Sequence, residues 1–197
     1  MFPVTTGDLF VINRSGIHSL PELNPKYIFS SSVPHALRRL RVLRVLREAD
    51  LIAAEDTRNS IRLLNYFEIE TPMTSYHEYN KFDKGRVLIE KLLEGKDIAL
   101  ITDAGTPGIS DPGEELVRMC YEEGITVTAV PGASACVSAL TISGLPTRRF
   151  AFEAFLPSDK KEREAVLSCL EKEQRTIVLY EAPHRLIKTL KMLGERL

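Results

Sequence analysis

Residues 98–113 read IALITDAGTPGISDPG, and this stretch decides the fold class. Its first five residues form a short apolar run, which is typical of a buried parallel strand. Residues 102–113 then hold three glycines, two prolines and two aspartates. Asp111 can cap a helix, Pro112 fits the first helical position, and Glu114 stands where a capping box needs it. A strand, a stiff loop and a helix in this order indicate an α/β fold.

Similar apolar runs lie on both sides of this stretch and alternate with helical patterns. Further strands are predicted at Leu51–Glu55, Thr126–Val130, Phe150–Phe155 and Thr176–Tyr180, with weaker ones at Pro72–Tyr76 and Leu9–Ile12. Apolar residues at helical spacing predict buried stripes between the strands, and these residues are Val42, Val45, Leu46, Ala49, Ile89, Leu92, Leu93, Leu116, Val117, Cys120, Tyr121, Leu186, Leu190, Leu193 and Leu197. The alternation predicts an α/β fold with a mainly parallel sheet.

Composition places the chain among ordinary globular proteins. It has 197 residues, 44% apolar and 27% charged, with a net charge of −1, so no global field attracts nucleic acid or an anionic membrane. No apolar run has the length of a membrane span, and the start MFPVTTGD lacks the features of a signal peptide. Three cysteines without C-x-x-C spacing fit a reducing compartment, so we expect a cytoplasmic protein.

Two loops of small residues are predicted to form a small-molecule cleft. In open α/β sheets ligands bind at the carboxyl ends of strands, where Thr102–Gly113 and Pro131–Ala135 lie. The dinucleotide pattern G-x-G-x-x-G and the phosphate loop are both absent. The alternatives are a tight strand-to-helix connection for the first loop and a simple helix start for the second. A connection alone needs only about two to six residues, which favours a ligand site for the first loop.

Polar side chains at strand ends are the candidate catalytic residues. Glu55 and Asp56 beside Arg58 could accept the proton of a hydroxyl substrate, and His77 follows another candidate strand. The alternatives are a helix cap with an ion pair at Asp56 or Thr57, and a solvated loop histidine. The four histidines are scattered and no cysteines are paired in sequence, so we predict no metal site.

Six segments in one order resemble the ribosomal RNA small subunit methyltransferase I family, the 16S rRNA (cytidine-2′-O)-methyltransferases of the tetrapyrrole methylase superfamily. They are LREADLIAAEDTR (46–58), TPMTSYHEYN (71–80), TDAGTPGISDPG (102–113), VPGASA (130–135), SGLPTRRFAFEAFLP (143–157) and LYEAPHRL (179–186). The resemblance covers Leu40 to Leu197. DAGTPGISDPG together with YEAPHRL is highly specific for this family.

This resemblance implies two α/β domains, expected at residues 1–130 and 131–197, and a homodimer. It implies S-adenosylmethionine as cofactor, bound by Ala104, Gly105, Thr106, Ile109, Ser134, Ala135 and Glu181. The implied reaction is 2′-O-methylation of a cytidine in 16S rRNA of the small ribosomal subunit, with no membrane partner. A tetrapyrrole-type small-molecule methylase and a non-catalytic cofactor-binding module are the alternatives.

The family pattern is incomplete at both ends of this sequence. Residues 1–37 lack the T-P-I-G-N-L loop of the family, and the chain stops after LGERL, where family members continue through further strands. We therefore expect a truncated C-terminal domain and impaired catalysis by this chain. The Arg residues between 38 and 47 and the pair Arg148–Arg149 are candidate RNA contacts, with a solvated helix face as the alternative for the first group.

Overall fold

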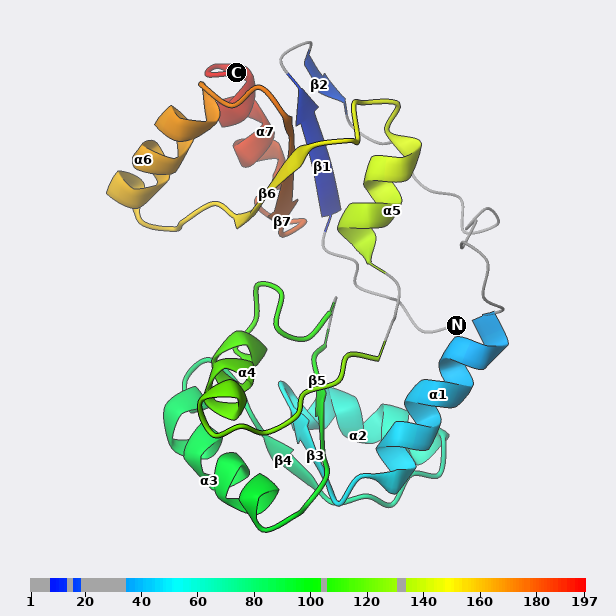
Figure 1. Ribbon diagram of the computed structural model, residues 1–197. Helices are drawn as coiled ribbons and strands as arrows, with labels where there is room; N and C mark the ends of the chain where they lie inside the picture. The colour runs from blue at the N-terminus through cyan, green and yellow to red at the C-terminus, as the bar shows by residue number, and fades with distance from the viewer. Residues whose placement is uncertain (1–7, 14–15, 19–34, 104–105, 131–133) are drawn as a thin grey trace. The chain divides into compact units, whose positions relative to one another are not determined.

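The computed structural model describes residues 8–13, 16–18, 35–103, 106–130 and 134–197 (Figure 1). They fall into two compact units. One unit lies within Phe29–Ala133 and holds a three-stranded sheet. The other combines Ser134–Leu197 with β1 (Asp8–Asn13) and β2 (Gly16–His18) and holds a four-stranded sheet. We call them the three-stranded unit and the four-stranded unit.

The sheet of the three-stranded unit is entirely parallel, with the order β4-β3-β5. Its strands are β3 (Leu51–Ala54), β4 (Met73–Ser75) and β5 (Ile98–Ile101). Its helices are α1 (His35–Glu48), α2 (Thr57–Tyr66), α3 (Lys81–Leu93) and α4 (Gly113–Glu122). Consecutive strands are joined through helices, so the prediction of an α/β fold with a mainly parallel sheet is confirmed.

Alternating residues of β3 supply both faces of this sheet. Ile52 and Ala54 pack with Leu46 of α1 and Leu64 of α2, whereas Ala53 faces the cluster formed by α3 and α4. Figure 1 shows α1 and α2 on one side of the sheet and α3 and α4 on the other. Because both faces are covered, β3 and β5 consist of apolar residues, as expected for a buried parallel sheet, whereas β4 at the edge also holds Thr74 and Ser75.

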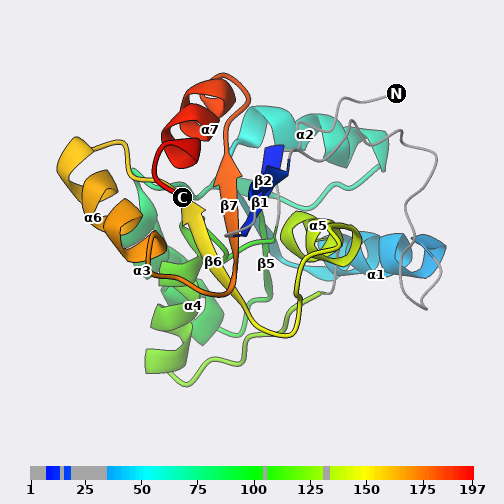
Figure 2. The same ribbon diagram turned by 90° about the horizontal axis from the view of Figure 1, so that it is seen from above.

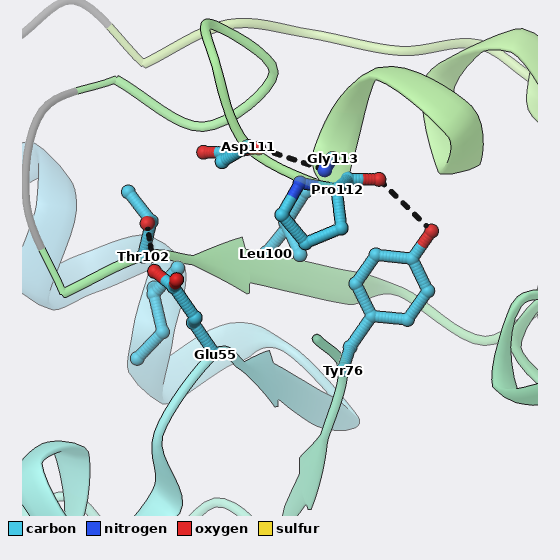
Figure 3. Close-up of a pocket in the computed structure, with 8 residues that line it drawn as sticks. Glu55, Tyr76, Leu100, Thr102, Asp111, Pro112 and Gly113 are labelled. Carbon is cyan, nitrogen blue, oxygen red and sulfur yellow. Dashed lines mark hydrogen bonds between the residues drawn. The ribbon is translucent and has the colours of Figure 1, made fainter. Parts of the chain in front are cut away.

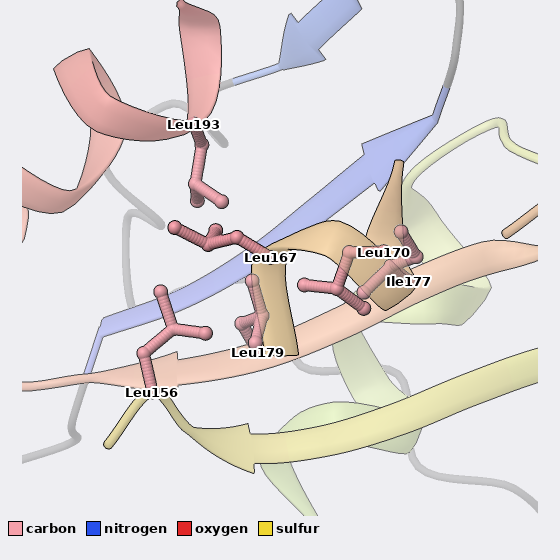
Figure 4. Close-up of a cluster of buried hydrophobic side chains, with 6 residues drawn as sticks. All are labelled: Leu156, Leu167, Leu170, Ile177, Leu179 and Leu193. Carbon is pink, nitrogen blue, oxygen red and sulfur yellow. The ribbon is translucent and has the colours of Figure 1, made fainter. Parts of the chain in front are cut away.

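The four-stranded unit has the strand order β2-β1-β7-β6. Strands β6 (Phe150–Phe155) and β7 (Thr176–Glu181) are parallel, and β1 is antiparallel to both β2 and β7. Helices α6 (Lys160–Leu170) and α7 (Leu186–Gly194) cover one face, and α5 (Ala135–Ile142) covers the other (Figure 2). A leucine-rich cluster lies under α6 and α7 (Figure 4), comprising Leu156, Leu167, Leu170, Ile177, Leu179 and Leu193.

The first strands lie in a different unit from the one expected. Residues 1–130 were expected to form one domain, whereas β1 and β2 join the four-stranded unit. Phe10 pairs with Leu179 and Ile12 with Ile177 in the antiparallel ladder. A strand joins whichever sheet edge offers ladder hydrogen bonds, and that edge is far away in sequence.

Some local predictions are wrong. No strand forms at Thr126–Val130, where Val127 is 42% exposed, because strand propensity is realised only against a neighbouring strand. Three members of the predicted helical stripes are also exposed, namely Val42, Leu93 and Tyr121. Each lies at the margin of a stripe, where the sheet no longer covers the helix.

Candidate active site at the strand ends of the three-stranded unit

Glu55 is the centre of a hydrogen-bonded group at the carboxyl end of the parallel sheet. It follows β3 directly, and Thr102 follows the neighbouring strand β5. The Thr102 hydroxyl donates to Glu55 Oε2 at 2.5 Å, and the backbone N–H of Asp103 donates to the same oxygen at 3.2 Å (Figure 3). No hydrogen bond to Glu55 Oε1 is made by the described residues, so this oxygen can accept a proton or a ligand hydrogen bond.

Asp111 closes the loop that leads into α4. Its Oδ1 accepts hydrogen bonds from the backbone N–H groups of Gly108 and Gly113, both at 2.7 Å. Within this loop Gly108 has φ +83° and Ser110 has φ +61°. Such a conformation is costly for serine and is found mostly where the surrounding structure imposes it, often at functional sites. Asp111 therefore fixes the described part of the predicted cofactor loop. The helix start differs from the prediction, because Pro112 is the N-cap of α4 and Asp111, one residue earlier, accepts from the first helical N–H at Gly113.

A small hollow lies between this loop and the strand ends. Its volume is about 10 Å³, which is on the order of one water molecule. It is lined by Glu55, Tyr76, Leu100, Ile101, Thr102, Asp111, Pro112 and Gly113. The hydroxyl of Tyr76 donates to the carbonyl of Pro112 at 3.1 Å, and burial raises the pKa of this phenol to about 12. The hollow is too small to hold a cofactor, so a ligand would have to bind outside it.

The structure resolves the alternatives for Asp56 in favour of the helix cap. Asp56 is the N-cap of α2 and accepts a hydrogen bond from the backbone N–H of Arg58 at 2.8 Å. The Arg58 guanidinium also forms an ion pair with it at 2.7 Å. Hydrogen bonding from Arg58 lowers the pKa of Asp56 to about 2. A carboxylate with so low a pKa is a weak proton acceptor, which makes Asp56 a poorer candidate base than Glu55.

Asp56 also gives a prediction for acid unfolding. Because its pKa is lower in the folded chain than in the unfolded chain, its stabilising contribution is present above about pH 4 and is lost as the pH falls through about 2. We expect Asp56→Asn to reduce the stability of the chain above pH 4 and to match the unaltered chain near pH 2. Urea unfolding at several pH values measures this difference. A difference that stays constant with pH would contradict the prediction.

His77 is held by Asn80 rather than by another candidate residue. Its backbone N–H donates to Asn80 Oδ1 at 2.8 Å, which turns the amide nitrogen of Asn80 toward His77 Nε2 at 3.3 Å. The other ring nitrogen, Nδ1, is buried without a partner among the described residues. None of the described contacts joins His77 to Glu55, so the structure does not support a Glu55–His77 pair.

The predicted cofactor residues are distributed over both units. Ala104 and Gly105 lie outside the described residues. Thr106 and Ile109 are exposed on the loop of the three-stranded unit, with Ile109 51% exposed. In the four-stranded unit Ser134 is the N-cap of α5 and Ala135 begins that helix. The Ser134 hydroxyl makes no capping hydrogen bond and lies 3.2 Å from Cys136 Sγ.

Glu181, the remaining predicted cofactor residue, is buried and fully engaged within the four-stranded unit. Its Oε2 accepts a hydrogen bond from Thr189 at 2.6 Å, and Oε1 accepts from the backbone of Ala182 at 2.7 Å and from Arg185 at 2.8 Å. Burial alone would raise the pKa of Glu181, but these hydrogen bonds and the Arg185 charge together lower it. Glu181 thereby ties the end of β7 to the start of α7.

The Glu181 network predicts a measurable loss of stability when one donor is removed. Thr189→Val keeps the shape of the side chain but leaves Glu181 Oε2 buried without a donor. Leaving a buried acceptor unpaired costs about 1–3 kcal/mol, so we expect a decrease of this size in the free energy of unfolding. Chemical denaturation measures it, and Thr189→Ser is the control because it keeps the hydroxyl. Equal stability of all three chains would show that Thr189 is dispensable.

A profile of the Tetrapyrrole (Corrin/Porphyrin) Methylases matches residues 40–197, about four-fifths of the sequence. The chain belongs to this family. The match includes the strand-end residues Glu55 and Thr102 and the loop closed by Asp111, as well as all of α5 to α7. The resemblance inferred from the sequence motifs is therefore confirmed at the level of the family.

Curated relatives named "Ribosomal RNA small subunit methyltransferase I" are similar to this chain. The relative from Synechocystis is 53% identical over 150 residues, covering 76% of this chain and 54% of its own length. That from Pseudomonas aeruginosa is 46% identical, covering 95% and 61%, and that from Thermotoga maritima is 47% identical, covering 80% and 72%. The chain thus spans between about half and three-quarters of these relatives.

A solved structure, uroporphyrin-III-C-methyltransferase from Thermus thermophilus, aligns with 24% identity and a TM-score of 0.43, covering 60% of this chain and 53% of that one. Within the described residues no group of three or more His, Cys, Asp or Glu side chains is placed to hold a metal ion. None of the described helices is long and apolar enough to cross a membrane.

Four residues of the site were not identified from the sequence as functional. Thr102 and Asp103 were read as loop residues, and Tyr76 as part of a weak strand, yet all three contribute to the group around Glu55 and Asp111. Asn59 also joins this edge, because its amide donates to Asp103 Oδ2 at 2.9 Å. Position along the sequence could have identified such residues, because Glu55, Tyr76 and Thr102 each follow a parallel strand directly.

Proposed function

We propose that this chain carries the cofactor-binding and catalytic part of an S-adenosylmethionine-dependent methyltransferase that acts on a cytidine 2′-hydroxyl of 16S rRNA in the small ribosomal subunit. One observation carries the proposal. Relatives 46–53% identical to this chain are named ribosomal RNA small subunit methyltransferase I, and the shared segment includes the strand-end site. A cytoplasmic homodimer, as the motifs suggest, belongs to the same proposal.

Several described residues fit S-adenosylmethionine. Ile109 offers an exposed apolar side chain, Thr106 is exposed beside it on the loop, and Ser134 has a hydroxyl free of any capping bond. The strained backbone at Ser110 indicates a loop held in one conformation, which lowers the ordering cost of binding a ligand. Ala104, Gly105 and Ala135 remain proposed contacts. Glu181 is proposed to shape the cofactor site by fixing the start of α7.

The cofactor supplies an activated methyl group, and the protein must align a hydroxyl with it and accept the proton. Glu55 suits the second task because Oε1 is open while Oε2 is anchored by Thr102 and Asp103. Anchoring one oxygen orients the other, and correct orientation supplies much of the acceleration in transfer reactions. With S-adenosylmethionine bound, its activated methyl group would be the electrophile, and Glu55 Oε1 would accept the proton of the attacking ribose oxygen.

RNA binding must depend on local basic residues, because the net charge is −1. Two arginines of the predicted group are engaged within the chain. Arg44 pairs with Glu48, and Arg47 donates to the carbonyl of Phe67. The pair Arg148–Arg149 is exposed before β6. We therefore favour Arg148 and Arg149 over the α1 arginines as phosphate contacts.

The experiment follows radioactive methyl transfer from S-adenosylmethionine by this chain and by a longer form with the length of its relatives. The acceptors are small-subunit particles, free 16S rRNA and uroporphyrinogen. We expect methyl incorporation into RNA that falls steeply with added salt, as phosphate contacts require. Incorporation into the porphyrinoid with none into RNA would reverse the assignment. Cofactor binding without transfer to any acceptor would favour a binding module.

A further inference from the structure

Asp111 holds one feature that its role in closing the loop does not explain. Both backbone donors bind Oδ1, whereas Oδ2 is buried and has no hydrogen-bond partner among the described residues. Figure 3 shows this second oxygen pointing away from Gly113, and Thr102 and Glu55 line the same hollow. A buried carboxylate oxygen without a donor is costly and calls for a proton, a water molecule or an ion.

Thr102 cannot supply the missing donor. Its hydroxyl has a single hydrogen, and the 2.5 Å contact commits that hydrogen to Glu55 Oε2. No hydrogen bond joins Thr102 to Asp111 Oδ2. A proton on Oδ2 would remove the need for a donor there.

We propose that Glu55 and Asp111 form a carboxylate pair beside one small hollow, in which Asp111 carries a proton in the folded chain. Two carboxylates beside one small hollow rarely both ionise, because each charge opposes the other. Asp111 is the more suitable holder of the proton because its free oxygen is buried, whereas Glu55 already accepts two hydrogen bonds on one oxygen.

The surrounding groups agree with this assignment. Burial raises the pKa of Asp111 above its ordinary value and the charge of Glu55 adds to that shift, whereas the backbone N–H groups of Gly108 and Gly113 and the nearby Thr102 side chain oppose it. Tyr76, which lines the same hollow, stays neutral because its pKa is about 12. Glu115 lies near Tyr76 but is paired with Arg118. None of the described groups around the hollow is a cation that would keep Asp111 ionised.

The pair would give the two acids separate tasks. Glu55 remains available to accept a proton from the substrate, while neutral Asp111 places no second negative charge beside it and keeps the loop closed through Oδ1. Asp111 is thus a positioning residue. This consequence for catalysis rests on the proposed function, but the location of the proton does not, so the test measures the proton by folding equilibria rather than by activity.

The test compares urea unfolding of the unaltered chain and Asp111→Asn between about pH 4 and pH 8. Asparagine imitates the protonated acid. If Asp111 is protonated when folded and ionised when unfolded, the unaltered chain loses stability relative to the variant as the pH rises, about tenfold in the unfolding equilibrium per pH unit until the raised pKa is passed. Asp56→Asn is the matched control. Because the pKa of Asp56 is lowered in the folded chain, the stability difference for this variant changes with pH in the opposite direction and at lower pH.

Two further results decide the assignment. In a Glu55→Gln background the pH-dependent advantage of Asp111→Asn should shrink, because the charge that opposes ionisation of Asp111 is gone. The folded, unaltered chain should also show the infrared carbonyl band of a protonated acid at about pH 6, a band that is lost on unfolding, since model aspartate has a pKa of about 3.9. The proposal would be overturned if the ratio of the two unfolding equilibria did not change with pH, or if that band were absent. It would also be overturned if Glu55→Gln alone changed the unfolding equilibrium tenfold in favour of the folded chain.

Discussion

Glu55→Gln is expected to reduce methyl transfer by about 100- to 10,000-fold, the range that a positioned general base contributes. The substitution keeps the size of the side chain and its acceptor oxygen for Thr102 and Asp103, but the amide cannot take up a proton. Affinity for S-adenosylmethionine should be unchanged, because Glu55 acts on the acceptor hydroxyl. Single-turnover transfer to small-subunit particles at saturating cofactor measures the chemical step, and calorimetry measures cofactor binding.

The neighbouring carboxylate provides the control for this prediction. Asp56→Asn removes the same charge one residue further along the chain, but Asp56 caps α2 and pairs with Arg58. We expect it to retain nearly normal transfer under conditions where it is folded. Normal turnover by Glu55→Gln would refute Glu55 as the base. An equal loss in both variants would show that the charge of this edge matters rather than proton acceptance by one residue.

Gly113→Ala is expected to destabilise the three-stranded unit by about 1–3 kcal/mol, the usual effect of adding atoms to a filled space. A Cβ at this position would lie 2.7 Å from Asp111 Oδ1, 2.8 Å from the backbone nitrogen of Gly108 and 2.8 Å from Leu100 Cδ2. Backbone cannot move aside as a flexible side chain can, so the Asp111-closed loop must open. We expect weaker cofactor binding together with the loss of stability, measured by denaturation and calorimetry.

Gly85→Ala is the matched control for this change. Gly85 is also buried, but it lies inside α3, and the added Cβ meets the flexible thioether of Met119 at 2.9 Å. Replacing a helical glycine with alanine gains about 1 kcal/mol from helix propensity, which offsets the crowding. We expect stability close to that of the unaltered chain. If Gly113→Ala were as stable as Gly85→Ala, the loop would not be as closely packed as its contacts indicate.

The sequence determined the local parts of this protein. Apolar runs such as Leu51–Ala54 and Ile98–Ile101 were predicted as buried strands because they are short and lie between helical patterns, and both form strands. Asp111 and Pro112 marked the start of α4, and the glycines at 95 and 124 adopt the positive φ expected where helices end. Position after a strand was enough to select Glu55 as a candidate.

The tertiary structure decided what depends on distant neighbours. The same residue types that form β7 remain outside any strand at Thr126–Val130, and β1 pairs with β7 across more than 160 residues, because ladder hydrogen bonds require a partner strand that local sequence does not specify. The tertiary structure also distinguished the candidate base, Glu55, from Asp56. Both are carboxylates in one tetrapeptide, but only the folded chain places Thr102 against Glu55 and Arg58 against Asp56. Burial then distinguishes Asp111 from an ordinary cap, since a carboxyl group's charge depends on the solvent and the donors that reach it.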